Sequence, residues 1–242
     1  GMGARNGVTS AMLVQAGWTG VNDVFSGPGN LFQSYAPKVA PEMLVDKLGE
    51  EYEVTKTIIK KWSTGGPIQS PLDAVDIIRR RRPFEFNDVQ AINIRVATSA
   101  ADKIDDSVMA NLSMQQMVAV LLVDKALSFK AAHDEARMND PEILRQKAKI
   151  KVIADESLER LLPARVAVVE ISFSDGTRET ERNDTVRGSP ANPMTSEEVA
   201  AKARDLMAPV LGDAKCERLI ETLFALEGLK DIGQLRPLLQ SP

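Results

Sequence analysis

Two adjacent lysines are the first residues that could carry chemistry. Lys60 and Lys61 stand a few residues before a loop that contains Gly65, Gly66 and Pro67. We expect the lysines at the end of a strand, where alternation would turn one side chain into a cleft and leave the other solvated. A lysine there can clamp a carboxylate, or act as a base if desolvation lowers its pKa. The alternative is two solvated lysines, since lysine is seldom buried.

The rarest residue types narrow the possible chemistry. The 242-residue chain has one cysteine, Cys216, and one histidine, His133. This excludes an intrachain disulfide, a Cys-ligated iron–sulfur cluster and a multi-histidine metal site within the chain. We predict no metal and no cofactor. Cys216 is interpreted as a small helix residue, and His133, beside Asp134 and Glu135, as a surface residue.

Glycine-containing and basic segments have ordinary explanations. The segments GMGARNG and SGPGN lack the spacing and the preceding strand of a dinucleotide-binding loop, so we interpret them as close packing and tight turns. Residues 79–82 are four arginines that could bind an anion. We interpret them instead as a solvated helix end, where cations complement the helix dipole.

Composition limits the partners. Lys and Arg number 30 against 34 Asp and Glu, a net charge of −4, so a nucleic-acid partner is not expected. No apolar run is long enough for a bilayer, and no signal peptide opens the chain. We therefore predict no membrane partner and a cytoplasmic location.

The first part of the chain predicts helices and one strand. Residues 8–16 are small or apolar on all sides, which is typical of a buried helix, with Gly17 as its left-handed cap. A helix is expected around 42–48 and a strand over 52–62. Ser70 should be the N-cap of a helix that runs to the arginines at 79–82.

The second part predicts a sheet followed by helices. Strands are expected at 89–98, 149–154 and 169–173, the last with a type I′ turn at Asp175 and Gly176 and a polar edge strand after it. Ser113 and Ser128 should cap two helices. Thr195 and Glu198 form a capping box for the first of two C-terminal helices.

This order of elements predicts an α+β fold in which an α+β domain is inserted between two helical pieces that pack together. The predicted divisions are a helical segment over residues 1–50, an α+β lid domain over 51–187, and C-terminal helices over 188–242.

The chain resembles the MmgE/PrpD family, whose members include 2-methylcitrate dehydratases, cis-aconitate decarboxylases and an iminodisuccinate epimerase. Four segments carry the resemblance, in the family's order: GARNGVTSAMLVQAGWTG, the stretch from Ile59 to Ala74, NLSMQQMVAVLLVD, and RGSPANPMTSEEVAAKARDL. The resemblance implies an all-helical domain with an α+β lid, an active site between them, and a homodimer. Family members are much longer, so this chain resembles a C-terminal half, and a separate chain could supply the N-terminal helical half.

The resemblance also implies site residues. Lys60 matches the family's active-site lysine. Gln69, Ser113 and Gln115 would be polar contacts in the cleft, and Arg5 and Asn6 would border it from the helical side. The chain departs from the family where several members have a histidine and it has Gly65, where many have a second histidine and it has Gln69, and where an aromatic residue often stands and it has Gln116.

The expected function is a cofactor-independent lyase, a hydro-lyase similar to 2-methylcitrate dehydratase, or an isomerase, with a small polycarboxylate as substrate. Such a reaction needs a base, an acid and cations that hold the carboxylates. The isolated chain is predicted to be inactive, because further site residues of the family precede Gly1. The alternative is a non-catalytic or split-subunit homologue retained for assembly.

Overall fold

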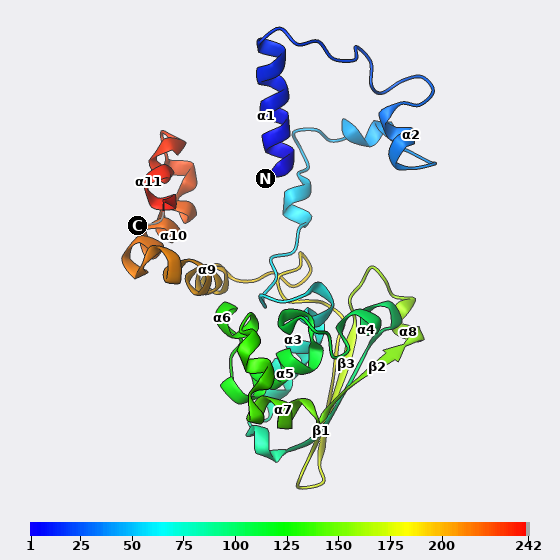
Figure 1. The fold of residues 1–242 in the computed structure, drawn as a ribbon, viewed down its shortest axis with the longest axis vertical. Helices are drawn as coiled ribbons and strands as arrows, with labels where there is room; N and C mark the ends of the chain where they lie inside the picture. The colour runs from blue at the N-terminus through cyan, green and yellow to red at the C-terminus, as the bar shows by residue number, and fades with distance from the viewer. Residues whose placement is uncertain (241–242) are drawn as a thin grey trace. The chain divides into compact units, whose positions relative to one another are not determined.

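The computed structural model describes residues 1–240 and divides into two compact units. One unit spans Gly1–Glu53, and the other begins at Val54. The chain is α+β, with one mixed sheet in the second unit (Figure 1). In the part of the chain that the structure describes, no helix combines the length and the apolar character needed to cross a bilayer.

The N-terminal helix is exposed, so the expectation of a buried helix is wrong. Helix α1 spans Met2–Gln15, and none of its residues is buried. Its end is as expected: Gly17 has φ +96°, and the amides of Gly17 and Trp18 donate to the carbonyls of Val14 and Leu13, which is a Schellman cap. Local sequence thus determines the helix and its end, whereas burial depends on a partner that residues 1–53 do not provide.

The rest of the first unit contains one short α-helix and little other regular structure. Helix α2 spans Leu31–Tyr35 and is capped by the side chain of Asn30. The helix expected over 42–48 is a single 3₁₀ turn, Pro41–Leu44. It stops there because the chain enters the left-handed region at Lys47, with φ 50°, and again at Gly49, with φ 88°.

The strand expected over 52–62 is absent from this described segment. The described segment holds a 3₁₀ turn at Glu53–Lys56 and then runs irregularly to the loop that follows. A backbone hydrogen bond links it to a distant segment, from the Ile59 amide to the Gly188 carbonyl. Its β-branched residues predicted a strand, but β propensity is weak where tertiary packing decides the backbone, and the described segment forms a 3₁₀ turn and an irregular stretch instead.

The sheet has the strand order β2-β1-β3-β4. Its strands are β1 (Val89–Ala97), β2 (Ile150–Asp155), β3 (Ala167–Phe173) and β4 (Arg178–Asn183). Strand β1 pairs parallel with β2 and antiparallel with β3, and β3 pairs antiparallel with β4. The three predicted strands and the polar edge strand are confirmed.

The predicted hairpin between β3 and β4 is confirmed, but its turn type is wrong. A type I′ turn needs positive φ at both central residues, whereas only Gly176 has one, at +84°. The Gly176 amide donates to the Phe173 carbonyl, and the Phe173 amide donates to the Thr177 carbonyl. The loop is therefore a three-residue connection with glycine in the left-handed position.

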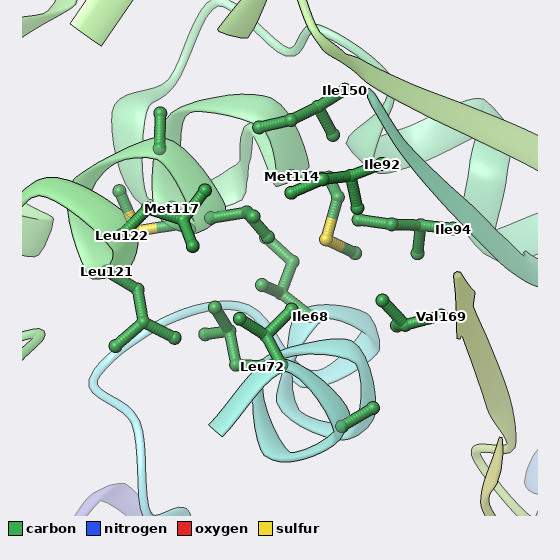
Figure 2. Close-up of a cluster of buried hydrophobic side chains, with 14 of the residues drawn as sticks. Ile68, Leu72, Ile92, Ile94, Met114, Met117, Leu121, Leu122, Ile150 and Val169 are labelled. Atoms are coloured by element: carbon green, nitrogen blue, oxygen red, sulfur yellow. The ribbon is translucent and has the colours of Figure 1, made fainter. Parts of the chain in front are cut away.

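Helices α3 (Gln69–Arg81) and α5 (Met114–Asp124) cover one face of the sheet, and α7 (Pro141–Lys147) packs on α5. Figure 2 shows side chains of α3 and α5 meeting those of the strands, with Leu72 and Met114 on the helix side and Ile92 and Ile94 on the strand side. All four side chains are fully buried. Burying a side chain of this size contributes about 1.5–3 kcal/mol, so this layer is the main source of stability.

Ser70 does not cap α3, contrary to expectation. A 3₁₀ turn, Gly66–Ile68, leads directly into the helix at Gln69. The Ser70 hydroxyl donates instead to the Asn183 carbonyl at the end of β4, 3.0 Å away. A tertiary partner has replaced the local one. The predicted caps of Ser113, Ser128 and the Thr195–Glu198 box are all present.

The remaining helices connect or extend this layer. They are α4 (Thr98–Ile104), α6 (Phe129–Ala132), α8 (Glu156–Glu159), α9 (Ser196–Leu211), α10 (Asp213–Phe224) and α11 (Arg236–Leu239). Helices α9 and α10 form a small core of their own around Ala200, Cys216 and Ile220. The interpretation of Cys216 as a small helix residue is confirmed.

Candidate functional site

A cavity of about 590 Å³ lies within the second unit. Four parts of the chain line it: the 58–65 segment, residues 109–112 just before α5, residues 129–133 of α6 and its end, and α9. Ile58, Trp62, Met109, Leu112, Phe129 and Leu206 form its apolar walls. Its polar side chains are Lys60, Ser63, Thr64, Asn111, His133 and Lys202. Among the described residues of the lining none is acidic, so the cavity combines two ammonium groups with neutral donors.

Lys60 reaches this cavity on an irregular segment that Gly188 anchors. The Lys60 ammonium donates to the Thr64 carbonyl at 3.2 Å. Gly188 has φ +93°, and a Cβ there would lie 1.8 Å from the Ile59 carbonyl oxygen. Only glycine therefore allows the two backbones to approach, and this contact sets the position of the neighbouring lysine.

Gln69 holds the loop after Lys60 in shape. Its side-chain carbonyl accepts from the Trp62 amide at 3.1 Å, and its NH₂ donates to the Trp62 carbonyl at 2.9 Å and the Thr64 hydroxyl at 3.0 Å. Gln69 is buried and lies outside the cavity lining. The structure thus places this predicted substrate contact beneath the loop, where its polar groups already have protein partners.

Lys202 is the second cation of the cavity, and sequence reasoning missed it. Its ammonium donates to the Ser63 hydroxyl at 3.1 Å and to the Lys61 carbonyl at 3.4 Å. Burial lowers the pKa of Lys202, Asp205 opposes this, and the charge of Lys60 lowers the pKa further. No local pattern in the sequence marked it, because α9 reaches the cavity only through tertiary packing.

His133 is exposed, as expected of a surface residue, but it also lines the cavity. Its Nδ1 lies 2.9 Å from the Phe129 carbonyl and its Nε2 lies 3.1 Å from the Asn111 side-chain nitrogen. A carbonyl only accepts, so we assign the proton to Nδ1, which leaves Nε2 to accept from Asn111. The ring also stacks on Phe129 at 4.3 Å.

Lys61 turns away from Lys60, but it is not solvated. Its ammonium lies 2.7 Å from the Asp76 carboxylate and 4.2 Å from the centre of the Trp62 ring. The expectation of a solvated partner lysine is therefore wrong. The same tryptophan donates from Nε1 to the buried Asp73 carboxylate at 2.9 Å, which also accepts from the Arg187 amide at 2.8 Å.

The structure does not bring the other predicted contacts into this lining. Ser113 is fully buried and caps α5. Gln115 accepts from the Asp106 amide at 2.8 Å and donates to the Asp105 carboxylate at 2.6 Å. Arg5 and Asn6 lie exposed on α1 of the first unit. Their contacts with a substrate stay predictions.

The arrangement suits a small anion better than a metal ion. Two ammonium groups and several neutral donors attract carboxylates. Across residues 1–240, the acidic, cysteine and histidine side chains form no group of three or more that could hold a metal ion.

Comparison with known proteins places the chain in a family. The MmgE/PrpD C-terminal domain family matches residues 62–226. A cis-aconitate decarboxylase of Aspergillus terreus is 25% identical over 267 residues, and one of Homo sapiens is 25% identical over 264 residues. Both alignments cover 100% of this chain, but only 54% and 52% of the relatives, so the chain spans about half the length of the curated relatives it matches. Because the family match covers more than half of its residues, the chain belongs to the MmgE/PrpD family.

Proposed function

We propose that the chain carries the carboxylate-binding part of a lyase whose substrate is a small polycarboxylate. The observation that carries this proposal is the pair of lysines, Lys60 and Lys202, in one cavity with no acidic residue in its described lining. The relatives named cis-aconitate decarboxylase supply the reaction class and the choice of a tricarboxylate as the first substrate to test.

The chemistry of decarboxylation fits a cavity of this kind. The bond between a carbon and one carboxylate breaks, CO₂ leaves, and the electron pair stays on the substrate until a proton arrives. Cations that hold the remaining carboxylates fix the substrate and stabilise the accumulating negative charge. In this proposal Lys60 and Lys202 are those cations.

Binding of cis-aconitate, measured by isothermal titration calorimetry, tests the role of the lysines. A hydrogen bond to a charged group contributes about 1.5–3 kcal/mol, so Lys60→Ala or Lys202→Ala should weaken binding at least about tenfold. Lys151, which is exposed on β2 outside the cavity, provides the matched control, and Lys151→Ala should change the affinity less than about twofold. Equal affinities for all three variants and the wild type would refute the proposal.

Product analysis separates the reaction types. Proton NMR of cis-aconitate incubated with the protein distinguishes loss of CO₂ from hydration and from isomerisation. We expect binding without turnover for the isolated chain, as the sequence predicted. Turnover would overturn that prediction and identify the reaction directly. Binding with no turnover, even beside a chain that supplies the N-terminal half, would favour the non-catalytic alternative, to which Gly65 in place of a histidine also points.

A further inference from the structure

We propose that His133 is the proton-carrying group of the cavity and contacts the bound polycarboxylate through its Nε2 atom. This inference rests on the proposed function, because it needs a carboxylate ligand between Lys60 and Lys202. It goes beyond that function because it assigns the proton transfer to His133, which the sequence analysis interpreted as a surface residue.

The imidazole is held in one orientation. The Phe129 carbonyl fixes Nδ1 at 2.9 Å, and the Phe129 ring stacks on one face of the imidazole. Helix α6, which carries Phe129, is held in turn by the Ser128 cap and by the Asp205 carboxylate, which accepts from the Phe129 amide at 2.6 Å. Nδ1 is thus committed to the Phe129 carbonyl, and Nε2, which accepts from Asn111, is the nitrogen that can gain a proton.

Asn111 holds the neutral imidazole through the same atom. Its NH₂ lies 3.1 Å from Nε2 and donates to the neutral ring. A protonated Nε2 can no longer accept from this NH₂, so in this proposal its N–H turns to the bound substrate. Asn111 is therefore a positioning residue, which holds the neutral ring in place between proton transfers.

The other polar groups of the cavity are less suited to this role. Lys60 and Lys202 are the cations that hold the substrate, and Ser63 and Thr64 are engaged with Lys202 and Gln69. An imidazole is the side chain that most readily gains and loses a proton near neutral pH. In the proposed step, Nε2–H gives its proton to the substrate carbon as CO₂ leaves, and the neutral ring regains a proton from water.

The charges around His133 are consistent with an anionic ligand. Lys60 and Lys202 line the same cavity, Asp205 binds the first residue of α6, and Lys130, Asp134 and Glu135 are near neighbours in sequence. The carboxylates of the substrate supply the negative charge that an imidazolium ion beside two lysines requires.

The experiment uses the fact that the chain has a single histidine, so its imidazole ¹⁵N signals need no assignment. In the free protein we expect Nδ1 to give the signal of a protonated nitrogen, because it lies 2.9 Å from the Phe129 carbonyl, which can only accept. Addition of cis-aconitate should move the Nε2 signal toward that of a protonated nitrogen. In Asn111→Leu the free-protein Nε2 signal should change and the ligand-induced movement should decrease, whereas Lys151→Ala should behave as wild type.

The outcomes separate the two proposals. If calorimetry shows binding that depends on Lys60 and Lys202 but the Nε2 signal does not move, the role of His133 is wrong and the proposed function stands. If cis-aconitate does not bind, both are overturned. Because His133 contacts the ligand in this proposal, His133→Gln should weaken cis-aconitate binding, and an affinity equal to that of wild type would contradict the contact.

Discussion

The adjacent residues Lys60 and Lys61 carry the same charge, but their surroundings differ. Lys60 turns into the cavity toward the Thr64 carbonyl, while Lys61 pairs with Asp76 and covers the Trp62 ring. Trp62 in turn donates to Asp73, a carboxylate that is only 5% exposed. Trp62 thus links Lys61 to Asp73. Because Asp73 is a buried acid, this network is sensitive to pH.

Asp73 gives a prediction about stability and pH. Burial raises the pKa of Asp73 above its ordinary value, although the Arg187 amide and Trp62 oppose the change. The folded state therefore prefers the protonated carboxyl, so its contribution to stability is fully present below pH about 3.8 and is lost as the pH rises through the raised pKa. Wild type should lose stability relative to Asp73→Asn over this range.

Urea unfolding at a series of pH values measures this difference. Asp102→Asn, at an exposed acidic residue on α4, is the control for a change of charge alone. A difference between wild type and Asp73→Asn that is constant from pH 3 to pH 7 would contradict the prediction.

At the scale of elements, the site depends on contacts between segments that are far apart in the chain. The 58–65 segment has no regular structure, and Gly188, Gln69 and the Asn111 carbonyl hold it in place. Helix α9 supplies Lys202, and α6 supplies the support for His133. The position of Lys60 therefore depends on a turn more than a hundred residues later.

Gly188→Ala tests this dependence. An alanine Cβ at that position would collide with the Ile59 carbonyl and would require a positive φ, so the segment before Lys60 should be displaced. We expect cis-aconitate affinity to fall at least about tenfold. Gly176→Ala, which also replaces a glycine with positive φ but has open space around it, is the control and should lower stability by about 1–2 kcal/mol without changing affinity. Retained affinity in Gly188→Ala would show that the anchor does not position Lys60.

At the scale of the whole molecule, each of the two units exposes large apolar side chains. Large apolar side chains are exposed on α1, among them Val8, Met12 and Val14, and on α10, among them Leu223 and Phe224. Exposed apolar patches of this kind mark interaction surfaces. The predicted homodimer and the separate chain that could supply an N-terminal helical half both stay predictions.

Light scattering coupled to size-exclusion chromatography tests the homodimer. We expect a mass of twice 26.4 kDa at micromolar concentration. Replacing Met12 and Val14 on α1 with glutamine, compared with the same change at exposed Val108 outside α1 and α10, shows whether α1 takes part. A monomeric mass at all concentrations would contradict the homodimer.

Local patterns in the sequence determined much of the fold and one member of the candidate site. Alternation located β1 and β3, the hydroxyl and acidic caps located the starts of α5 and α9, and the MmgE/PrpD resemblance identified Lys60. These features are local or are carried by short motifs, so they can be read without knowledge of the fold.

Only the tertiary structure decided how the site is assembled. The segment before Lys60 looks like a strand, but no sheet edge accepts it, and its place is set by Gly188. Ser70 looks like a cap, but Asn183 competes for its hydroxyl. Lys202 and His133 carry no local signal of function, because they lie far from Lys60 in the chain and packing alone brings them to one cavity.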